Sequence, residues 1–208
     1  MSLTFYYSPM SSATRIHWAL EELGVPYDKV KIDLAAGDQK KPEYLALNPN
    51  GKVPLLVADG VPIFESVAIL IYLGEKYGVE SGLFPALGPE RAEALKWMAW
   101  ANVTMADAIT RIIRNLSDRF PAEQRNAAAG EAAKVELLNL WKMVDHALEG
   151  RDHLVGDHFT LVDLAVVGFV MVTARFGVDI SSLKNVQRWS GPCMSRPAMG
   201  RVMASYAG

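Results

Sequence analysis

Two adjacent serines, Ser11 and Ser12, lie where a short apolar segment gives way to a helical pattern. Hydroxyls at such a point commonly cap the helix by accepting backbone N–H groups. The position also suits another chemistry, because a helix N-terminus and a hydroxyl donor together stabilise a thiolate. Lowering the pKa of a free thiol from about 8.5 by about two units requires roughly 2.7 kcal/mol. The two residue types therefore allow either simple capping or activation of a bound thiol.

A second informative segment is NPNGKVPLL, residues 48–56, in which Pro54 opens an apolar run. Proline cannot donate to a β-ladder, so it belongs at a sheet edge or in a turn. A cis Val53–Pro54 bond would turn the Val53 N–H and C=O outward, where an extended peptide could pair with them. X–Pro bonds are usually trans. From the residues alone, a trans proline that only blunts an edge is the simpler interpretation.

A third segment is FESVAILIYL, residues 64–73, where Glu65 and Ser66 stand between an expected strand and a helix. Free backbone N–H groups and the helix dipole favour an anion there, and the Ser66 hydroxyl adds a donor. Glu65 could hold an ammonium group. Together the two residues match the charges of an amino-acid end, although an ordinary N-cap serine beside an acidic residue is the alternative.

The hydrophobic pattern supplies the elements that must position these segments. The N-terminal part predicts, in order, a strand, a helix, a strand, a short helix, a hairpin turning at Asp59-Gly60 and a covering helix. The two strands are expected at 3–7 and 28–34, and the hairpin at 54–64. The first helix should end at Gly24, the short helix should span 42–48, and the covering helix should span 66–77. In the second strand Val30, Ile32 and Leu34 should share the inner face. This order indicates a parallel βαβ unit followed by an antiparallel hairpin.

Beyond the N-terminal part the composition changes. A Gly- and Pro-rich linker is expected at residues 79–88, and helical patterns follow at 90–118, 122–149, 160–176 and 198–206. No strand is expected after residue 88. The chain is therefore predicted to form an α/β domain over 1–78 and an all-helical domain over 89–208.

Composition and charge exclude several classes of protein. The 208 residues carry a formal net charge of -2 with scattered Lys and Arg, which argues against nucleic acid as a partner. The N-terminus lacks the pattern of a signal peptide. The longest apolar stretch, 161–174, contains Asp163 and is too short to span a membrane. A cytoplasmic location is the expectation.

Cysteine and histidine usage limits the metal and redox chemistry. The single cysteine, Cys193, allows no internal disulfide and no multi-cysteine metal site, and it should lie in a Gly-Pro-Cys turn. His146, His153 and His158 show no ligand spacing, and His17 is expected on the surface. No metal site is predicted.

SPMSSATR, NPNGKVPLL and FESVAILIYL, in this order, resemble the soluble glutathione transferases, in particular bacterial-like members with a serine-type active site. A fourth match, GDHFTLVDLAVVG at residues 156–168, resembles the family's buried capping box, in which Thr160 caps a helix and Asp163 reaches back to it. We assign that motif to folding. The resemblance covers nearly the whole chain and implies the family fold, an α/β thioredoxin-like N-terminal domain followed by an all-α C-terminal domain.

The resemblance also implies how glutathione would be held. It makes Pro54 cis and lets the preceding Val53 orient the cysteinyl backbone. Glu65 and Ser66 would then hold the γ-glutamyl end. Three further positions, Gln39, Lys40 and Lys52, fall near the expected glycine carboxylate, with Lys52 as the stronger candidate. The alternative is that both lysines are solvated surface residues.

The catalytic residue depends on which branch of the family the chain follows. Serine-using members place the hydroxyl at Ser11, whereas the cysteine of related bacterial members falls on Ser12. The missing thiol argues against disulfide reduction. Tyr7 matches a tyrosine of those bacterial members, though a tyrosine at a strand end is more often core. The maleylacetoacetate isomerase branch carries an SSC-like motif, and here Ala13 stands in its cysteine position.

The resemblance implies an electrophile pocket between the two domains. Five residues are candidates for its walls, and an aromatic or Met stripe at helical spacing is otherwise usually core or dimer contact. They are Met10, Trp100, Met105, Arg111 and Tyr206. The expected function is transfer of the glutathione thiolate to apolar electrophiles by a homodimer, with glutathione as co-substrate and no metal. The alternatives are a glutathione-dependent isomerase or dehalogenase on the same scaffold, or a glutathione-binding protein without turnover.

Overall fold

The computed structural model describes residues 2–207 and divides into two compact units. Among these residues the first unit comprises 2–86 together with 195–207, and the second comprises 87–194. No helix in the part of the chain that the structure describes is both long enough and apolar enough to cross a membrane.

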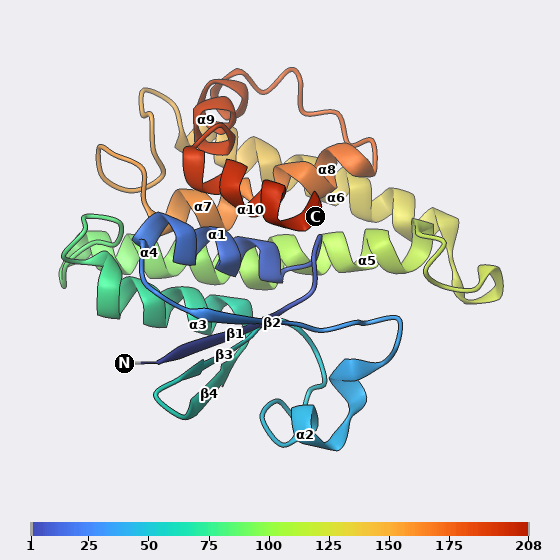
Figure 1. The fold of residues 1–208 in the computed structure, drawn as a ribbon. Coiled ribbons are helices and arrows are strands. Elements are labelled where there is room, and N and C mark those ends of the chain that lie inside the picture. The colour runs from blue at the N-terminus through green and yellow to red at the C-terminus, as the bar shows by residue number, and fades with distance from the viewer. Residues whose placement is uncertain (1, 208) are drawn as a thin grey trace. The chain divides into compact units, whose positions relative to one another are not determined.

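The first unit is built on a four-stranded mixed sheet in the order β2-β1-β3-β4 (Figure 1). β1 pairs parallel with β2 and antiparallel with β3, while β3 and β4 form a hairpin. The hairpin turns at Asp59 and Gly60, whose φ angles of 49° and 84° are those of the expected primed turn. The strands are β1 (Leu3–Tyr7), β2 (Asp28–Lys31), β3 (Leu55–Ala58) and β4 (Val61–Phe64). The predicted topology is confirmed.

The second strand is shorter than predicted. β2 ends at Lys31, and only Ile32 of the three residues expected on its inner face is buried. Val30 is 39% exposed and Leu34 40% exposed, because β2 lies at the edge of the sheet.

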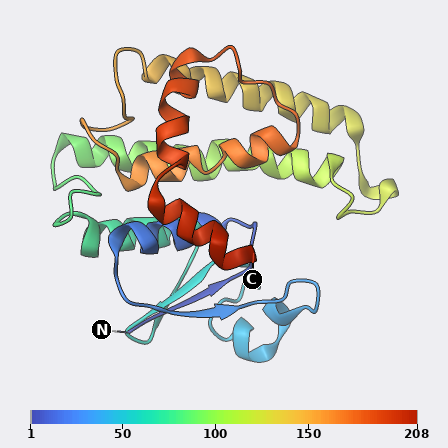
Figure 2. The ribbon, with the colours of Figure 1, turned by 45° about the horizontal axis from the view of Figure 1, so that its top comes forward.

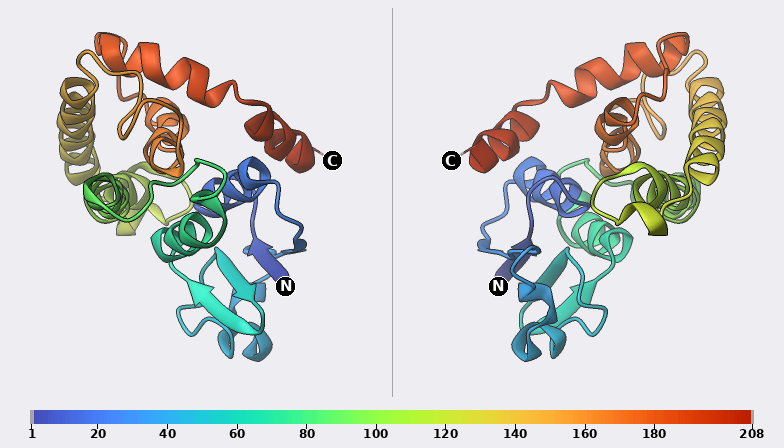
Figure 3. Two further views of the ribbon diagram at one scale, coloured as in Figure 1. Left: turned by 90° about the vertical axis from the view of Figure 1, so that its left-hand side faces the viewer. Right: turned by 90° about the vertical axis from the view of Figure 1, so that its right-hand side faces the viewer.

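Helices α1 (Ala13–Leu23) and α3 (Ser66–Leu73) lie on the same face of the sheet (Figure 3). α1 ends as predicted at Gly24, whose φ of 63° lets its N–H donate to the Leu20 carbonyl. α3 continues into a π-helical turn, η2 (Gly74–Gly78). A short helix, α2 (Pro42–Leu45), follows the 3-10 turn η1 (Asp38–Lys40).

The last helix, α10 (Pro197–Ala207), belongs to the first unit, which differs from the predicted domain of residues 89–208. It lies along α1 (Figure 2). Arg196, just before α10, contacts both carboxylate oxygens of Glu22 at 2.8 Å, and Arg201 contacts Glu21 at 2.7 Å. These ion pairs join residues more than 170 positions apart, a separation that helical periodicity does not reveal.

The second unit is all-helical, as predicted. The expected helix 90–118 is one helical run interrupted by a π-helical stretch, and the expected helix 160–176 is divided near Gly168. The elements are α4 (Pro89–Trp100), η3 (Ala101–Met105), α5 (Ala106–Leu116), η4 (Ala122–Gln124), α6 (Ala127–Ala147), α7 (Leu161–Val167), α8 (Val170–Arg175) and α9 (Lys184–Met194).

Helix α9 was not predicted. It contains Pro192, and the expected Gly-Pro-Cys turn is helical instead, with Cys193 buried. The turn prediction is wrong because glycine and proline only disfavour a helix interior, and the burial of Val186, Trp189 and Cys193 outweighs that cost.

The predicted capping box is confirmed at the start of α7, whose seven residues are all buried. Asp163 accepts hydrogen bonds from the Thr160 N–H at 3.0 Å, the Leu154 N–H at 3.0 Å and the Trp189 indole at 2.8 Å. One carboxylate therefore ties together the helix start, the preceding loop and α9. The motif serves the fold.

Candidate functional site

The three segments singled out by sequence meet at one end of the sheet. Leu55 of β3 pairs with both Tyr6 of β1 and Phe64 of β4. Pro54 immediately precedes Leu55 and Glu65 immediately follows Phe64, so both lie at that end beside the C-terminal end of β1. The first turn of α1 starts from the same place. The sheet register thus brings residues from three separate parts of the sequence together.

Val53 is the centre of this arrangement. The Val53–Pro54 bond is cis, as the resemblance implied. The preceding carbonyl, that of Lys52, accepts the Tyr44 hydroxyl at 2.6 Å and the Asn48 amide at 2.8 Å, which fixes the turn. Over residues 2–207, neither the N–H nor the C=O of Val53 pairs with another backbone group. Both are groups with which an extended peptide could pair as an added strand.

The two serines do different things. The half-buried Ser11 hydroxyl donates to the Ser8 carbonyl at 2.7 Å and accepts the Ala13 N–H at 3.2 Å. The exposed Ser12 hydroxyl makes no capping bond and donates instead to the Val53 carbonyl at 3.2 Å. Local capping therefore accounts for Ser11 in the ligand-free chain, whereas Ser12 faces the cis-proline segment.

Tyr7 is buried in an aromatic cluster and stacks on Phe5 and Tyr206, with ring centroids 5.6 and 5.8 Å apart. His17 belongs to the same cluster and is only 1% exposed, so its expected surface position is wrong. The pattern misplaced it because residues 15–20 of α1 are all buried, the helix being covered on two sides. These contacts favour a core role for Tyr7.

Burial sets the protonation of this cluster. It lowers the pKa of His17 to about 4, with the nearby Lys29 adding to the effect, so the imidazole is neutral at pH 7. The His17 ring nitrogen Nδ1 and the Tyr206 hydroxyl share a hydrogen bond of 3.1 Å. Burial raises the pKa of Tyr206 to about 12, so this phenol stays protonated. Tyr206 is half-buried and is held by α1.

Glu65 and Ser66 form the junction between β4 and α3. Glu65 is exposed and adopts a φ of 70°, a conformation that costs energy for any residue but glycine and is found preferentially at functional sites. Ser66 is the first residue of α3 and is half-buried. The N-terminal backbone groups of α3 and the Ser66 hydroxyl lie together at this junction.

The structure also places a residue here that the sequence analysis did not single out. Arg15 of α1 is 6% exposed, and its guanidinium Nη2 lies 3.5 Å from the Ser66 hydroxyl oxygen. Burial lowers the pKa of Arg15 to about 10, which still leaves it charged at pH 7. Its position in the helical repeat could have indicated its burial, because Arg15 lies four residues before Ala19 on the buried face of the helix.

Gln39 and Lys40 lie in η1, against the turn that leads to Lys52. A Cβ atom on Gly51, whose φ is 57°, would come within 2.8 Å of the Lys40 ammonium and 2.9 Å of the Gln39 carbonyl. The Gln39 side-chain oxygen is buried and lacks a hydrogen-bond partner within residues 2–207. Lys40 and Lys52 are exposed. Two cations thus border the Val53 segment.

The predicted electrophile residues fall in both units. In the first, Met10 is 50% exposed and has a φ of 54°. In the second, Trp100 is half-buried and contacts Trp97 edge to face at 5.3 Å, whereas Met105 has no exposed surface, which favours a core role. Arg111 binds Asp107 at 2.8 Å and Glu136 at 2.6 Å and so joins α5 to α6.

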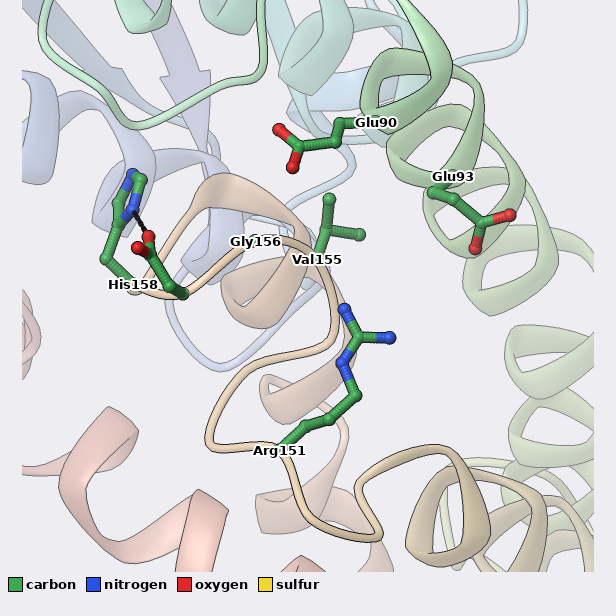
Figure 4. Close-up of a pocket in the computed structure, with 7 residues that line it drawn as sticks. Glu90, Glu93, Arg151, Val155, Gly156 and His158 are labelled. Atoms are coloured by element: carbon green, nitrogen blue, oxygen red, sulfur yellow. Dashed lines mark hydrogen bonds and ion pairs between the residues drawn. The ribbon is translucent and has the colours of Figure 1, made fainter.

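A separate depression of about 370 Å³ lies within the second unit (Figure 4). Glu90 and Glu93 of α4 and Arg151 of the loop after α6 line it, and Asp157 pairs with His158 at its edge at 2.7 Å. No group of His, Cys, Asp and Glu side chains within residues 2–207 could hold a metal ion. None of the residues that line the depression belongs to the predicted site.

Two family models match the chain. The model described as Glutathione S-transferase, N-terminal domain, matches residues 1–75, and that described as Glutathione S-transferase, C-terminal domain, matches residues 102–197. Glutathione S-transferase GstB of Escherichia coli is 34% identical over 93% of both chains. Disulfide-bond oxidoreductase YfcG of E. coli is 32% identical over 97% of this chain and 94% of that protein.

Solved structures agree in fold. Ure2p in complex with glutathione superposes with a TM-score of 0.88 at 28% identity and covers 97% of this chain and 98% of that chain. A glutathione transferase from Burkholderia graminis, with two glutathione molecules per subunit, superposes with a TM-score of 0.87 at 29% identity over 98% of this chain and 88% of that one.

Proposed function

The chain belongs to the glutathione S-transferase family, and on that premise we propose that it binds glutathione along Val53 and transfers the sulfur to apolar electrophiles. The observation that carries the proposal is the approach of the first turn of α1 to the Val53 backbone, where Ser12 and Val53 are 3.2 Å apart. A tripeptide paired with Val53 would place its central residue, the cysteine, beside the start of this helix.

The charged groups of glutathione have matching partners on either side of Val53. The γ-glutamyl carboxylate would lie on the N-terminus of α3 and the Ser66 hydroxyl, and the exposed Glu65 would hold the γ-glutamyl ammonium. The glycine carboxylate would lie near Lys40 and Lys52, with Gln39 as their neighbour.

Thiol activation is assigned to Ser11. Its hydroxyl donates to a neutral carbonyl in the ligand-free chain, and exchange of that bond for one to a thiolate is favourable because charge-assisted hydrogen bonds are stronger. The Ala13 N–H already donates to the same oxygen, which polarises the hydroxyl. Ser12 would make the corresponding exchange from the Val53 carbonyl, and Tyr7 is the third candidate.

The binding site for the electrophile is also assigned on the basis of family membership. Met10 and Tyr206 of the first unit supply apolar surface, and neither a metal nor a redox cofactor is required because positioning and the lowered thiol pKa carry the catalysis. We expect a cytoplasmic homodimer, as the family membership suggests.

Ultraviolet titration of the thiolate of bound glutathione tests the proposal. The bound thiol should titrate about two units below the free value of about 8.5, and a panel of apolar electrophiles should consume glutathione. Binding without thiolate formation would indicate a glutathione-binding protein without turnover. Isomerisation of maleylacetoacetate with no net loss of glutathione would indicate the isomerase alternative, and release of halide the dehalogenase.

A further inference from the structure

The buried charge on α1 needs a physical reason. Arg15 carries a buried positive charge on this helix, where His17 is neutral at pH 7 and the buried Glu22 carboxylate pairs with Arg196. Desolvating a cation is costly, and proteins keep one buried where it serves another group. A Leu or Met at this position would fill the same space without that cost.

One contact of Arg15, to the Ser66 hydroxyl, indicates which group the cation serves. A guanidinium carries only donors, so in its 3.5 Å contact the Ser66 oxygen is the acceptor. On its other side the same hydroxyl then acts as a donor. Ser66 is the first residue of α3, where the helix dipole adds positive potential. The cation, the hydroxyl and the helix start therefore all favour a negative charge at one point.

We propose that Arg15 is a positioning residue that acts through Ser66 to select the α-carboxylate of the γ-glutamyl group. This inference rests on the proposed function. The guanidinium holds the Ser66 hydroxyl in the donating orientation, and its charge, poorly screened by water because it is buried, strengthens the attraction of the α3 N-terminus for the carboxylate. Arg15 would not touch the sulfur or the electrophile.

If Arg15 has this role, its replacement should weaken only the binding of ligands that carry the α-carboxylate. We would measure dissociation constants by calorimetry for glutathione, for 4-aminobutyryl-cysteinylglycine, which lacks only the α-carboxylate, and for glutaryl-cysteinylglycine, which lacks only the amine. Arg15→Met should weaken binding of glutathione and of the glutaryl peptide roughly tenfold or more. Binding of the aminobutyryl peptide should not change.

Two further variants complete the comparison. Arg15→Lys, which keeps the charge but not the planar fork, should retain part of the preference for the carboxylate. Arg119→Met, at an exposed position of the second unit, is the matched control and should bind all three ligands as the wild type does. In turnover assays Arg15→Met should raise the KM for glutathione while kcat at saturation stays close to the wild-type value.

The outcomes distinguish a failure of the proposed function from a failure of the role assigned to Arg15. If the wild-type protein binds none of the peptides, the proposed function fails, and the role of Arg15 with it. If the wild type binds glutathione but Arg15→Met weakens all three ligands equally, Arg15 is only structural and the proposed function stands. Unchanged glutathione binding in Arg15→Met also overturns the inference. Should that variant not fold, Arg15→Gln is judged by the same three dissociation constants.

Discussion

The Ser12 hydroxyl donates to the carbonyl oxygen of Val53 across 3.2 Å and so links the start of α1 to the segment before β3. The two residues are 41 positions apart. Their contact places a helix N-terminus, which favours a thiolate, beside a backbone that is open to a peptide. The proposed binding and activation of a peptide thiol would therefore require no rearrangement of the sheet.

Replacing the candidate hydroxyls one at a time should identify the group that activates the thiol. In Ser11→Ala the pKa of bound glutathione should rise part of the way toward about 8.5, because the hydroxyl supplies only part of the roughly 2.7 kcal/mol of thiolate stabilisation. At pH 6.5 kcat/KM should fall roughly 10-fold or more. Ser12→Ala and Tyr7→Phe are the matched controls and should keep most of the activity. Full activity in Ser11→Ala would contradict the assignment.

The burial of His17 should make the fold sensitive to mild acid. Its pKa is about 4 in the folded chain and about 6.5 in the unfolded chain, so the unfolded chain binds more protons between these values. The free energy of unfolding should therefore fall as the pH drops from about 6.5 toward 4, by up to about 3 kcal/mol.

Urea denaturation at several pH values checks the acid sensitivity. In His17→Gln the loss of stability over this range should be clearly smaller than in the wild type. His146→Gln is the matched control, because the His146 side chain is 82% exposed and belongs to the second unit. Equal pH dependence in the wild type and in His17→Gln would show that other groups carry it.

Removing the Asp163 carboxylate should destabilise the second unit strongly. Asp163→Asn replaces an acceptor of four donors by a group that is itself half donor. The donors are the Leu154 N–H, the Thr160 N–H and hydroxyl, and the Trp189 indole. We expect a loss of roughly 3 kcal/mol or more in the free energy of unfolding, measured by urea titration. Asp157→Asn, whose side chain is 97% exposed, should leave the midpoint unchanged.

The two-pronged contact between Arg196 and Glu22 should hold α10 on α1. Arg196→Met leaves the buried Glu22 carboxylate with the Trp18 indole at 2.9 Å but without its cation, which should cost roughly 2 kcal/mol. Amide hydrogen exchange should accelerate in residues 197–207. In the control, Lys96→Met, an exposed ion pair with Glu93 is lost and exchange in α10 should not change. Unaltered protection in Arg196→Met would show that apolar contacts alone hold the helix.

The sequence predicts the fold well wherever local signals agree. The apolar runs, the Asp59-Gly60 turn, the Gly24 stop and the Thr160–Asp163 box each specify their element without help from distant residues. The failures have one cause in common. Pro192 inside α9, the burial of His17 and the packing of α10 on α1 are decided by partners far away in the sequence, and tertiary burial overrides local propensity there.

The candidate site shows the same division. Residue types alone favour a trans edge proline at Pro54 and an ordinary N-cap at Ser66, and only the family resemblance singles out Val53, Pro54, Glu65 and Ser66 as glutathione-binding candidates. Arg15 cannot be found in this way, since its contact with Ser66 joins two helices. Which of the two serines faces Val53 depends on a difference of about 100° around α1 between neighbouring positions, and helical periodicity does not resolve it.

The discontinuity of the first unit has a consequence for synthesis. Its strands and α1 leave the ribosome first, whereas α10, which completes the packing on α1, leaves only after residues 87–194 have been translated. During that interval Glu21 and Glu22 lack their arginine partners, and the side of α1 that α10 later covers faces water or a chaperone. A nascent chain stalled before Ser195 should thus be recognised by holdase chaperones, and release of the last helix would end that interaction.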